Sequence, residues 1–391
     1  MAEEEFYRIN LLPPYVFEEV NALKAKLRGD GRDIIDLGMG NPDMPTPPHI
    51  VDKLIETVQK PRTHGYSTSR GIKGLRRAMA RYYARRFGVA LDPETEIVAT
   101  LGSKEGFANL AQAITAPGDV IISPDPAYPI HAYGFIIAGG VISPVAASDP
   151  ETHLSAIAHA IEKAHMKPRA IVLNYPSNPT AQTVGLDFYK DAVALANKHD
   201  VLILSDLAYS EIYYGDPPPS ILQVEGAKDI AVEVNSLSKS YAMAGWRIGM
   251  AVGNPRMIRA LARVKSYLDY GAFTPIQVAA VAALDSPPEA VAEMRAIYTG
   301  RRDVLLESFA NAGWDVPPPD ASMFAWAPVP EQYRALGSVG FAKLLMEKAD
   351  VAVAPGLGFG EGGEGFVRIG LVENQQRIRQ GARNIRRILK N

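Results

Sequence analysis

The sequence predicts an α/β protein: a large domain with a mostly parallel sheet flanked by helices, plus a smaller α+β domain built from both termini. The chain has 391 residues, which exceeds the roughly 250–300 that one hydrophobic core usually accommodates. Short β-branched runs alternate with helical patterns through its middle, as in a sheet buried on both faces. This alternation stops near residue 285. We therefore expect an N-terminal segment (1–44) packing on the small domain, a large domain (45–285) and a small domain (286–391).

The expected strands of the large domain are short apolar runs that end at polar or turn-forming residues. In chain order they are IVAT (97–100), DVIIS (119–123), RAIVLN (169–174), VLILSD (201–206), DIAVEVN (229–235) and IGMAVG (248–253). Helical patterns lie between them, at 103–114 and 186–199. Strands that alternate with helices in this way favour a doubly wound sheet.

The C-terminal part has a different pattern of expected helices and strands. One long helix is expected over 287–312, followed by three short strands and two further helices. The strands are MFAWA (323–327), VAVAP (351–355) and FVRIG (366–370), and the helices cover 338–348 and 374–389. A further helix near 16–28 belongs to the N-terminal segment. Strands without a βαβ series indicate an α+β unit.

Composition excludes several classes of protein. The formal net charge of -2 provides no basic surface for nucleic acid. The absence of cysteine excludes disulfides and thiolate chemistry. The acidic start MAEEEFYRIN does not resemble a secretory signal, and no apolar run reaches the roughly 18 residues of a membrane span. The seven histidines lack metal-ligand spacing. We expect a cytoplasmic protein without a metal, a nucleic-acid partner or a membrane partner.

Polar residues that can take part in catalysis or ligand binding follow four of the expected strands. Ligands of open α/β sheets bind beyond the carboxyl ends of the strands, so these residues are candidates for one common site. They are Gly102, Ser103 and Lys104 after the first strand, Asn178 after the third, Asp206 and Tyr209 after the fourth, and Ser236, Ser238, Lys239 and Arg247 after the fifth. The first group opens a helix, where free backbone N–H groups favour a phosphate.

Each candidate also has an ordinary structural explanation. Ser103 can be a helix cap, Asn178 before proline can start a turn, and Lys239 can be a solvated cation. Asp206 at the end of a strand can be a turn former. These explanations would require four coincidences at the same edge of one sheet. A lysine beside a phosphate cradle, together with a carboxylate for a pyridinium nitrogen, is instead the arrangement that pyridoxal phosphate requires.

Two other motifs are present without their usual context. Ser236 and Lys239 match the Ser-x-x-Lys of penicillin-binding proteins, but the Lys-Thr-Gly and Ser-Asp-Asn motifs of that family do not occur. Gly358, Gly360 and Gly363 match Gly-x-Gly-x-x-Gly, but a strand-like run follows where the dinucleotide fingerprint needs a helix. We interpret this glycine-rich stretch as a flexible hinge loop.

The residues resemble those of fold-type I pyridoxal-phosphate-dependent aminotransferases of class I/II, and more narrowly the bacterial glutamate–pyruvate (alanine) transaminase branch. The similarity covers nearly the whole chain. Its motifs are DLGMGNPD (36–43), HGYSTSRGIKGLRRA (64–78), GSKEG (102–106), PAYPIH (126–131), PSNPTAQ (176–182), SDLAYSEI (205–212), SLSKSYAMAGWRIG (236–249) and FVRIGLVEN (366–374). Ala181 stands where the family usually has glycine, and we expect a small backbone adjustment without loss of activity.

The resemblance implies a role for each matching residue. Lys239 would bind the cofactor aldehyde covalently, Asp206 would pair with the pyridine nitrogen, and Tyr209 and Asn178 would bond the ring hydroxyl. The phosphate would be surrounded by Gly102, Ser103, Lys104, Ser236, Ser238 and Arg247, and Tyr128 would stack on the ring. Tyr66 would reach the phosphate of a neighbouring subunit, which implies a homodimer. Arg368 would bind the substrate carboxylate, helped by the Gly40 backbone; the alternative is an exposed residue on an edge strand.

The predicted reaction is transfer of an α-amino group between an amino acid and a 2-oxo acid, with alanine and 2-oxoglutarate giving pyruvate and glutamate. Tyr15 and Tyr270 are expected to line the side-chain pocket, Tyr270 from the partner subunit. Four alternatives use the same cofactor: an aspartate, methionine or LL-diaminopimelate aminotransferase, or a C–S lyase. A non-catalytic regulator would usually carry an additional DNA-binding domain, for which the chain has no basic segment.

Overall fold

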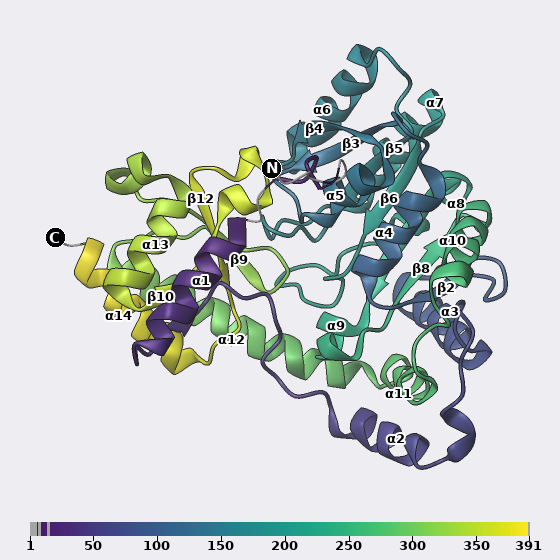
Figure 1. The fold of residues 1–391 in the computed structure, drawn as a ribbon, viewed down its shortest axis with the longest axis horizontal. Coiled ribbons are helices and arrows are strands. Elements are labelled where there is room, and N and C mark those ends of the chain that lie inside the picture. The colour runs from purple at the N-terminus through teal and green to yellow at the C-terminus, as the bar shows by residue number, and fades with distance from the viewer. Residues whose placement is uncertain (1–5, 7–8, 14–15, 390–391) are drawn as a thin grey trace.

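The computed structural model describes residues 6, 9–13 and 16–389. It has two lobes, and the long helix α12 (Pro288–Ala312) runs from one to the other (Figure 1). The large lobe is built on a seven-stranded sheet and the small lobe on a three-stranded one. No helix in the described part of the chain combines the length and apolar composition that crossing a membrane requires.

The sheet of the large lobe has the strand order β2-β8-β7-β6-β5-β3-β4. Its strands run parallel except β8, which is antiparallel to both of its neighbours. The predicted mostly parallel sheet is therefore confirmed. The strands are β2 (Ile97–Thr100), β3 (Val120–Asp125), β4 (Val141–Ala146), β5 (Ala170–Asn174), β6 (Leu202–Asp206), β7 (Ala231–Ser236) and β8 (Gly249–Gly253).

Helices cover both faces of this sheet, which explains its unbroken apolar strands. Successive side chains of a strand point to opposite faces, and in β5 Val172 belongs to one core while Ile171 belongs to the other. The first face carries α4 (Ser103–Ile114), α5 (Ile130–Ala138) and α10 (Pro255–Leu268). The second carries α3 (Lys73–Phe87), α6 (Pro150–Lys163), α7 (Leu186–His199) and α11 (Thr274–Leu284), with α2 (Pro48–Val58) packed on α11.

The small lobe combines both ends of the described chain. Its sheet has the order β11-β12-β9, all antiparallel, with β9 (Phe324–Pro328), β11 (Ala354–Pro355) and β12 (Phe366–Gly370). Helices α12, α13 (Gly337–Ala349) and α14 (Gln375–Leu389) pack around it. A short strand β1 (Ile35–Asp36) pairs with β10 (Val351–Ala352), and α1 (Val16–Gly29) shares an apolar cluster with α13.

Local sequence signals account for several helix boundaries. The side chain of Asp149 accepts the N–H of Glu151 at the start of α6, and that of Asn254 accepts the N–H of Met257 at the start of α10. Both are typical N-cap residues. Helix α12 ends at Gly313, whose φ of 93° is a left-handed conformation that glycine adopts without a steric penalty.

The large-lobe elements that were not predicted include β4 and the helices α2, α3, α5, α6, α10 and α11. Helix α5 is short and mostly apolar, because it packs against α4 and the sheet, so it lacks the alternation that marks a surface helix. Strand β4 contains Pro144 and lies at the edge of the sheet, the position where proline is tolerated. The single strand expected over 351–355 is divided at Val353 between two sheets.

Ala181 adopts the conformation that glycine would have at this position. Its φ is 61°, its side chain is fully buried, and its N–H donates to the carbonyl of Ser177. Its own carbonyl accepts the N–H of Ala321. These contacts hold an alanine in the left-handed region, which L-residues other than glycine and asparagine rarely adopt.

Glu233 is a fully buried carboxylate in β7 that is surrounded by neutral hydrogen-bond donors. Its oxygens accept the hydroxyls of Ser220 at 2.6 Å and Tyr83 at 2.9 Å, and the N–H of Ile221 at 3.2 Å. Burial raises the pKa of Glu233 to about 7, even though these hydrogen bonds oppose the rise. The carboxyl group therefore binds its proton more tightly in the folded chain than in the unfolded one.

This pKa predicts that the protein loses stability as pH rises through 7. Between the ordinary glutamate pKa and about 7, the folded state binds more protons than the unfolded state. Unfolding free energy then falls with pH, by about 1.4 kcal/mol for each unit of pKa difference. Glu233→Gln should lessen this loss, so the melting temperature of the variant relative to wild type should increase from pH 5 to pH 8. The exposed Glu225→Gln is the control; a parallel profile for Glu233→Gln would contradict the expectation.

Candidate active site

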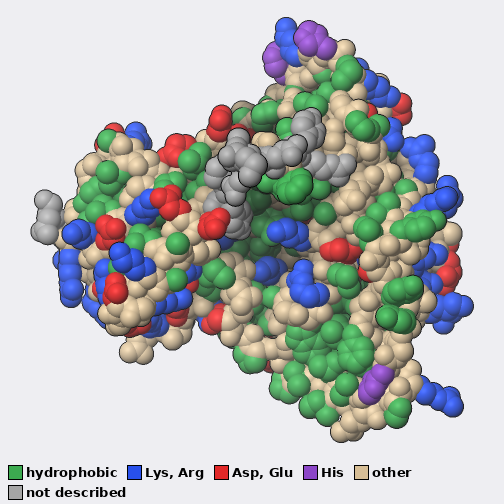
Figure 2. All heavy atoms as spheres, in the orientation of Figure 1, with side chains coloured by type: hydrophobic (Ala, Val, Ile, Leu, Met, Phe, Trp, Pro, Cys, Tyr) green, Lys and Arg blue, Asp and Glu red, His purple; other side chains and the backbone are tan. Residues whose placement is uncertain are grey.

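The carboxyl ends of the parallel strands open into a cavity of about 470 Å³ between the two lobes. Figure 2 looks onto this hollow, in which lysine and arginine side chains gather. Twelve residues expected at the site line it: Gly40, Ser103, Lys104, Tyr128, Asn178, Asp206, Tyr209, Ser236, Ser238, Lys239, Arg247 and Arg368. They come from segments up to 328 residues apart (40 to 368), which the fold brings together.

The start of helix α4 and Arg247 form an anion cradle. Gly102 precedes the helix with a φ of 83°, and a Cβ atom there would lie 2.4 Å from the Arg247 Nη2 atom. The guanidinium occupies this space and donates to the carbonyls of Leu101 at 3.1 Å and Ala244 at 2.8 Å. Free N–H groups at a helix start and a fixed guanidinium are suited to bind a phosphate.

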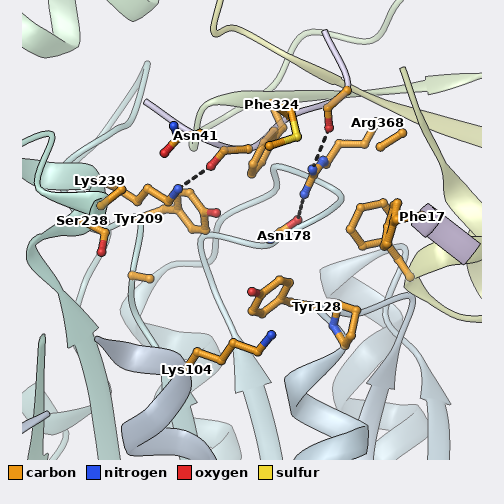
Figure 3. Close-up of a pocket in the computed structure, with 18 of the residues that line it drawn as sticks. Phe17, Asn41, Lys104, Tyr128, Asn178, Tyr209, Ser238, Lys239, Phe324 and Arg368 are labelled. Atoms are coloured by element: carbon orange, nitrogen blue, oxygen red, sulfur yellow. Dashed lines mark hydrogen bonds between the residues drawn. The ribbon is translucent and has the colours of Figure 1, made fainter. Parts of the chain in front are cut away.

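Lys239 places its amine at the centre of the cavity (Figure 3). It lies in the single turn α9 (Leu237–Ser240), which Ser236 caps by accepting the N–H of Ser238. The Nζ atom donates to the Gly40 carbonyl at 2.5 Å. Burial, and to a smaller extent the charges of Arg368 and Arg247, lower the pKa of Lys239 to about 7. A large fraction of this amine is therefore neutral, and nucleophilic, at physiological pH.

Asp206 ends strand β6 and is buried on the floor of the cavity. One carboxylate oxygen accepts the N–H of Ala208 at 3.1 Å, and the other lies 2.9 Å from Nε2 of His131. His131 is fully buried on α5, and its ring packs against Phe107 with 5.0 Å between centroids. The histidine thus holds the carboxylate in one orientation.

Three further side chains complete the large-lobe wall. Burial raises the pKa of Tyr209 well above its usual range, so its phenol remains a proton donor at physiological pH. Asn178 donates its N–H to the side chain of Asn174 at 3.0 Å. Tyr128 faces the cavity, and the Nζ atom of Lys104 lies 5.9 Å from the centre of its ring.

The small lobe contributes Arg368 from the central strand β12. Its Nη1 atom donates to Oδ1 of Asn178 at 2.7 Å, and its Nη2 atom to the Gly38 carbonyl at 3.3 Å (Figure 3). The guanidinium carbon lies 3.9 Å from the ring centre of Phe324. Arg368 is only 7% exposed, so the alternative of an exposed residue on an edge strand is wrong.

Three expected residues of the described chain do not line the cavity. Gly102 lies beside it, against Arg247. Tyr66 and Tyr270 form an exposed pair with ring centres 4.7 Å apart; Tyr66 is 89% exposed and Tyr270 63%. Tyr15 lies outside the described residues.

Sequence reasoning assigned no role to His131, Phe324 or Phe359. His131 is 75 positions from its carboxylate partner, and no local pattern connects the two. Phe324 packs on Arg368 only because β9 and β12 are paired, with Gly370 opposite Phe324. Phe359 belongs to the stretch that was interpreted as a hinge loop. That stretch is anchored to the large lobe, since Gly362 N–H donates to Asp125 and the Phe359 carbonyl accepts Ala127 N–H.

The residues present fit pyridoxal 5'-phosphate. The cradle at α4 can hold its phosphate, because Gly102 leaves room for Arg247. Lys239 can attack its aldehyde, since the amine has a pKa of about 7. Asp206 provides a buried carboxylate for the ring nitrogen. Within the described chain, no group of three or more His, Cys, Asp or Glu side chains is placed to hold a metal ion.

The sequence matches the family model "Aminotransferase class I and II" over residues 32–385. The chain therefore belongs to this family of fold-type I enzymes, and it is an aminotransferase that uses pyridoxal 5'-phosphate.

Relatives match the chain over almost its whole length. A putative aminotransferase AatC of Rhizobium meliloti is 65% identical over 99% of this chain and 96% of its own. The glutamate-pyruvate aminotransferase AlaC of Escherichia coli is 52% identical over 98% and 93%. An LL-diaminopimelate aminotransferase of Moorella thermoacetica is 42% identical over 99% and 98%. The substrate-bound BacF structure from Bacillus subtilis superposes with a TM-score of 0.93 at 33% identity, covering 99% and 98% of the two chains.

The pKa of Lys239 predicts that its amine reacts at unusually low pH in the cofactor-free protein. Labelling should rise with pH and reach half its maximum near 7, since only the neutral amine is nucleophilic. Arg368→Gln should move this midpoint to higher pH, because it removes a positive charge that favours the neutral form. Trace acetic anhydride labelling followed by peptide mass spectrometry measures the profile, with the exposed Lys198 as internal reference. Labelling of Lys239 only above pH 9 would contradict the expectation.

Proposed function

We propose that the enzyme transfers the amino group of L-alanine to 2-oxoglutarate, giving pyruvate and L-glutamate. The observation that carries the transaminase chemistry is the meeting of Lys239, Asp206 and Arg368 in one cavity. The substrate assignment is supported by the 52% identity to a glutamate-pyruvate aminotransferase over 98% of the chain. The LL-diaminopimelate aminotransferases match at lower identity, about 42%, and remain the alternative.

Arg368 is proposed to bind the substrate α-carboxylate as a two-pronged donor. Asn178 and the Gly38 carbonyl orient its guanidinium, and Phe324 supports one face. Gly40 lies beside both residues: its carbonyl accepts Lys239 Nζ, and a Cβ atom added to it would lie 3.4 Å from Arg368 Nη2. A substrate held by its carboxylate would therefore have its α-carbon directed toward the amine.

Lys239 Nζ is proposed to take the proton from the substrate α-carbon and later to return one. A pKa near 7 suits both directions of this transfer. When bound, the cofactor supplies an electron-accepting ring that stabilises the negative charge left at that carbon. Asp206, oriented by His131 and Ala208, would keep the ring nitrogen protonated. Tyr209 would donate a hydrogen bond to the ring hydroxyl oxygen, together with Asn178.

Lys104 is proposed to have a second role beside its backbone contribution to the phosphate cradle. Its side chain lies along the Tyr128 ring, across the cavity from Arg368 (Figure 3). An ammonium at this position can attract the distal carboxylate of glutamate or 2-oxoglutarate. It does not impede alanine, whose methyl group needs no partner, so one pocket can accept both substrates.

A homodimer with shared sites is also proposed. Exposed apolar side chains gather around α2 and the segment before α11: Ile55, Val58, Tyr66, Tyr267, Leu268, Tyr270 and Phe273, and Figure 2 shows hydrophobic side chains on this part of the surface. Patches of this kind mark protein–protein contacts. The Tyr66–Tyr270 pair would then complete the neighbour's site. Domain boundaries at 44/45 and 285/286 and a cytoplasmic location belong to the same proposal.

The substrate proposal is tested with a panel of amino donors against pyruvate and 2-oxoglutarate. Alanine with 2-oxoglutarate should give the highest kcat/KM. A preference for LL-diaminopimelate, aspartate or methionine would replace the proposed donor by that amino acid. Release of pyruvate and ammonia without any 2-oxo acid acceptor would indicate a C–S lyase.

Lys239→Ala should abolish turnover, because it removes the amine that is proposed to bind the aldehyde and move the proton. The fold should persist, since the hydrogen bond of this amine in the described structure is to the Gly40 carbonyl, which solvent can replace. The assay is steady-state transamination, and melting temperature reports folding. Lys198→Ala on the exposed face of α7 is the control; full activity in Lys239→Ala would remove the assignment.

Asp206→Ala should lower kcat by several orders of magnitude, because the ring nitrogen loses the anion that keeps it protonated. The control is Asp216→Ala, which removes an exposed carboxylate. Transamination at saturating cofactor measures the effect, so that weaker cofactor binding does not contribute. Unchanged kcat would show that this carboxylate does not act on the ring.

A further inference from the structure

Lys265 is a fully buried lysine on α10 that lies outside the residues lining the cavity. Its Nζ atom donates to Glu105 Oε1 at 2.8 Å and to Asp269 Oδ2 at 2.9 Å. Glu105 belongs to the first turn of α4, which packs against α10, whereas Asp269 directly follows α10. The ammonium therefore connects two segments. One is α4, whose start forms the phosphate cradle, and the other begins at Asp269 and contains Tyr270 of the exposed tyrosine pair.

The Glu105 side of this link reaches the phosphate cradle. Glu105 Oε2 accepts the N–H of Leu101 at 2.7 Å, and Asn109 donates to Oε1 at 2.5 Å. The carbonyl of Leu101 in turn accepts the guanidinium of Arg247 at 3.1 Å. The carboxylate thus determines the path of the backbone into Gly102, at the point where Arg247 fills the space that a Cβ atom would need.

The Asp269 side reaches the tyrosine pair. Asp269 Oδ1 accepts the N–H of Gly271 at 2.6 Å, and its backbone carbonyl accepts the hydroxyl of Ser69 at 2.5 Å. Gly271 has a φ of 77° and packs so closely that a Cβ atom would lie 2.3 Å from the Thr68 carbonyl. The segment that carries Tyr66 and the segment that carries Tyr270 are therefore held against each other beside the Asp269 carboxylate.

Buried charge of this kind specifies geometry more than it adds stability. Removing an ammonium and two carboxylates from water offsets much of their attraction, and apolar residues could fill the same volume. What apolar residues could not do is fix the orientation of Glu105 and of the 269–271 turn at once. Lys265 also neutralises a carboxylate that would otherwise stand unbalanced beside the phosphate cradle.

We propose that Lys265 is a positioning residue. Through Glu105 it orients the phosphate cradle of its own subunit, and through Asp269 it orients the Tyr66–Tyr270 pair, so that the position of one is fixed relative to the other. The inference rests on the proposed function, in which α4 holds the cofactor phosphate and the tyrosine pair reaches the neighbouring subunit. Lys265 touches neither substrate nor cofactor. Its removal should therefore weaken cofactor binding while the chemical step remains largely intact.

The test is the dissociation constant of pyridoxal 5'-phosphate, titrated into the cofactor-free protein and followed by absorbance. Lys265→Met should raise this constant at least about tenfold, whereas kcat at saturating cofactor should stay within a few-fold of wild type. Arg259→Met, an exposed cation on the same helix, is the matched control and should change neither quantity. An unchanged dissociation constant in a folded Lys265→Met protein would overturn the inference.

If Lys265→Met fails to fold, Asp269→Asn tests the proposed link instead, because this substitution keeps the side-chain shape and removes only one charge. Asp269 is bonded to Lys265, which in turn is bonded to Glu105 of α4, so weaker cofactor binding in this variant supports the link, and wild-type binding by a folded variant overturns it. Glu105→Gln should weaken binding similarly. Failure of the wild-type protein to bind the cofactor would overturn the proposed function, and this inference with it.

Discussion

A lysine amine withdrawn from water beside two guanidinium groups is the constraint that the remaining structure must satisfy. Burial is the main cause that lowers the pKa of Lys239 to about 7, and the positive charges of Arg368 and Arg247 lower it further. Arg247 is held by two backbone carbonyls of the large lobe, and Arg368 by Asn178 and the Gly38 carbonyl. Because Arg368 belongs to a small-lobe strand, the reactivity of the amine depends on the relative position of the two lobes.

Several contacts between the lobes surround the cavity. The segment that follows β1 supplies two carbonyls: that of Gly38 accepts the Arg368 guanidinium, and that of Gly40 accepts Lys239 Nζ. On the opposite rim, Asp125 at the end of β3 accepts the N–H of Gly362, and Ala127 donates its N–H to Phe359. Many of these contacts are made by backbone groups rather than by flexible side chains. They fix the position of the small lobe relative to the carboxyl ends of the strands.

Carboxyl groups near the sheet are stabilised in two different ways. Glu233 has only neutral donors around it, and its pKa rises to about 7. Glu105 is instead bonded to the ammonium of Lys265, and Glu211 to the guanidinium of Arg86. The difference matches their locations, since Glu233 lies on the buried strand β7, whereas Glu105 orients backbone next to the anion cradle. A neutral acid can serve packing, but orientation of N–H donors favours a full charge.

The sequence by itself determined the α/β class, most strands of the large sheet and nine of the residues that line the cavity, because buried strands and strand-end polar residues are encoded locally. Gly40, Tyr128 and Arg368 were expected only from the family resemblance of the motifs that contain them. Edge strand β4, the apolar helix α5 and the division of 351–355 between two sheets lacked a local signal. Only the tertiary structure decided that His131 orients Asp206, that Phe324 supports Arg368 and that Lys265 joins α4 to the tyrosine pair. These contacts connect residues 44 to 160 positions apart, and such pairing depends on how helices and strands pack rather than on any pattern of neighbouring residues.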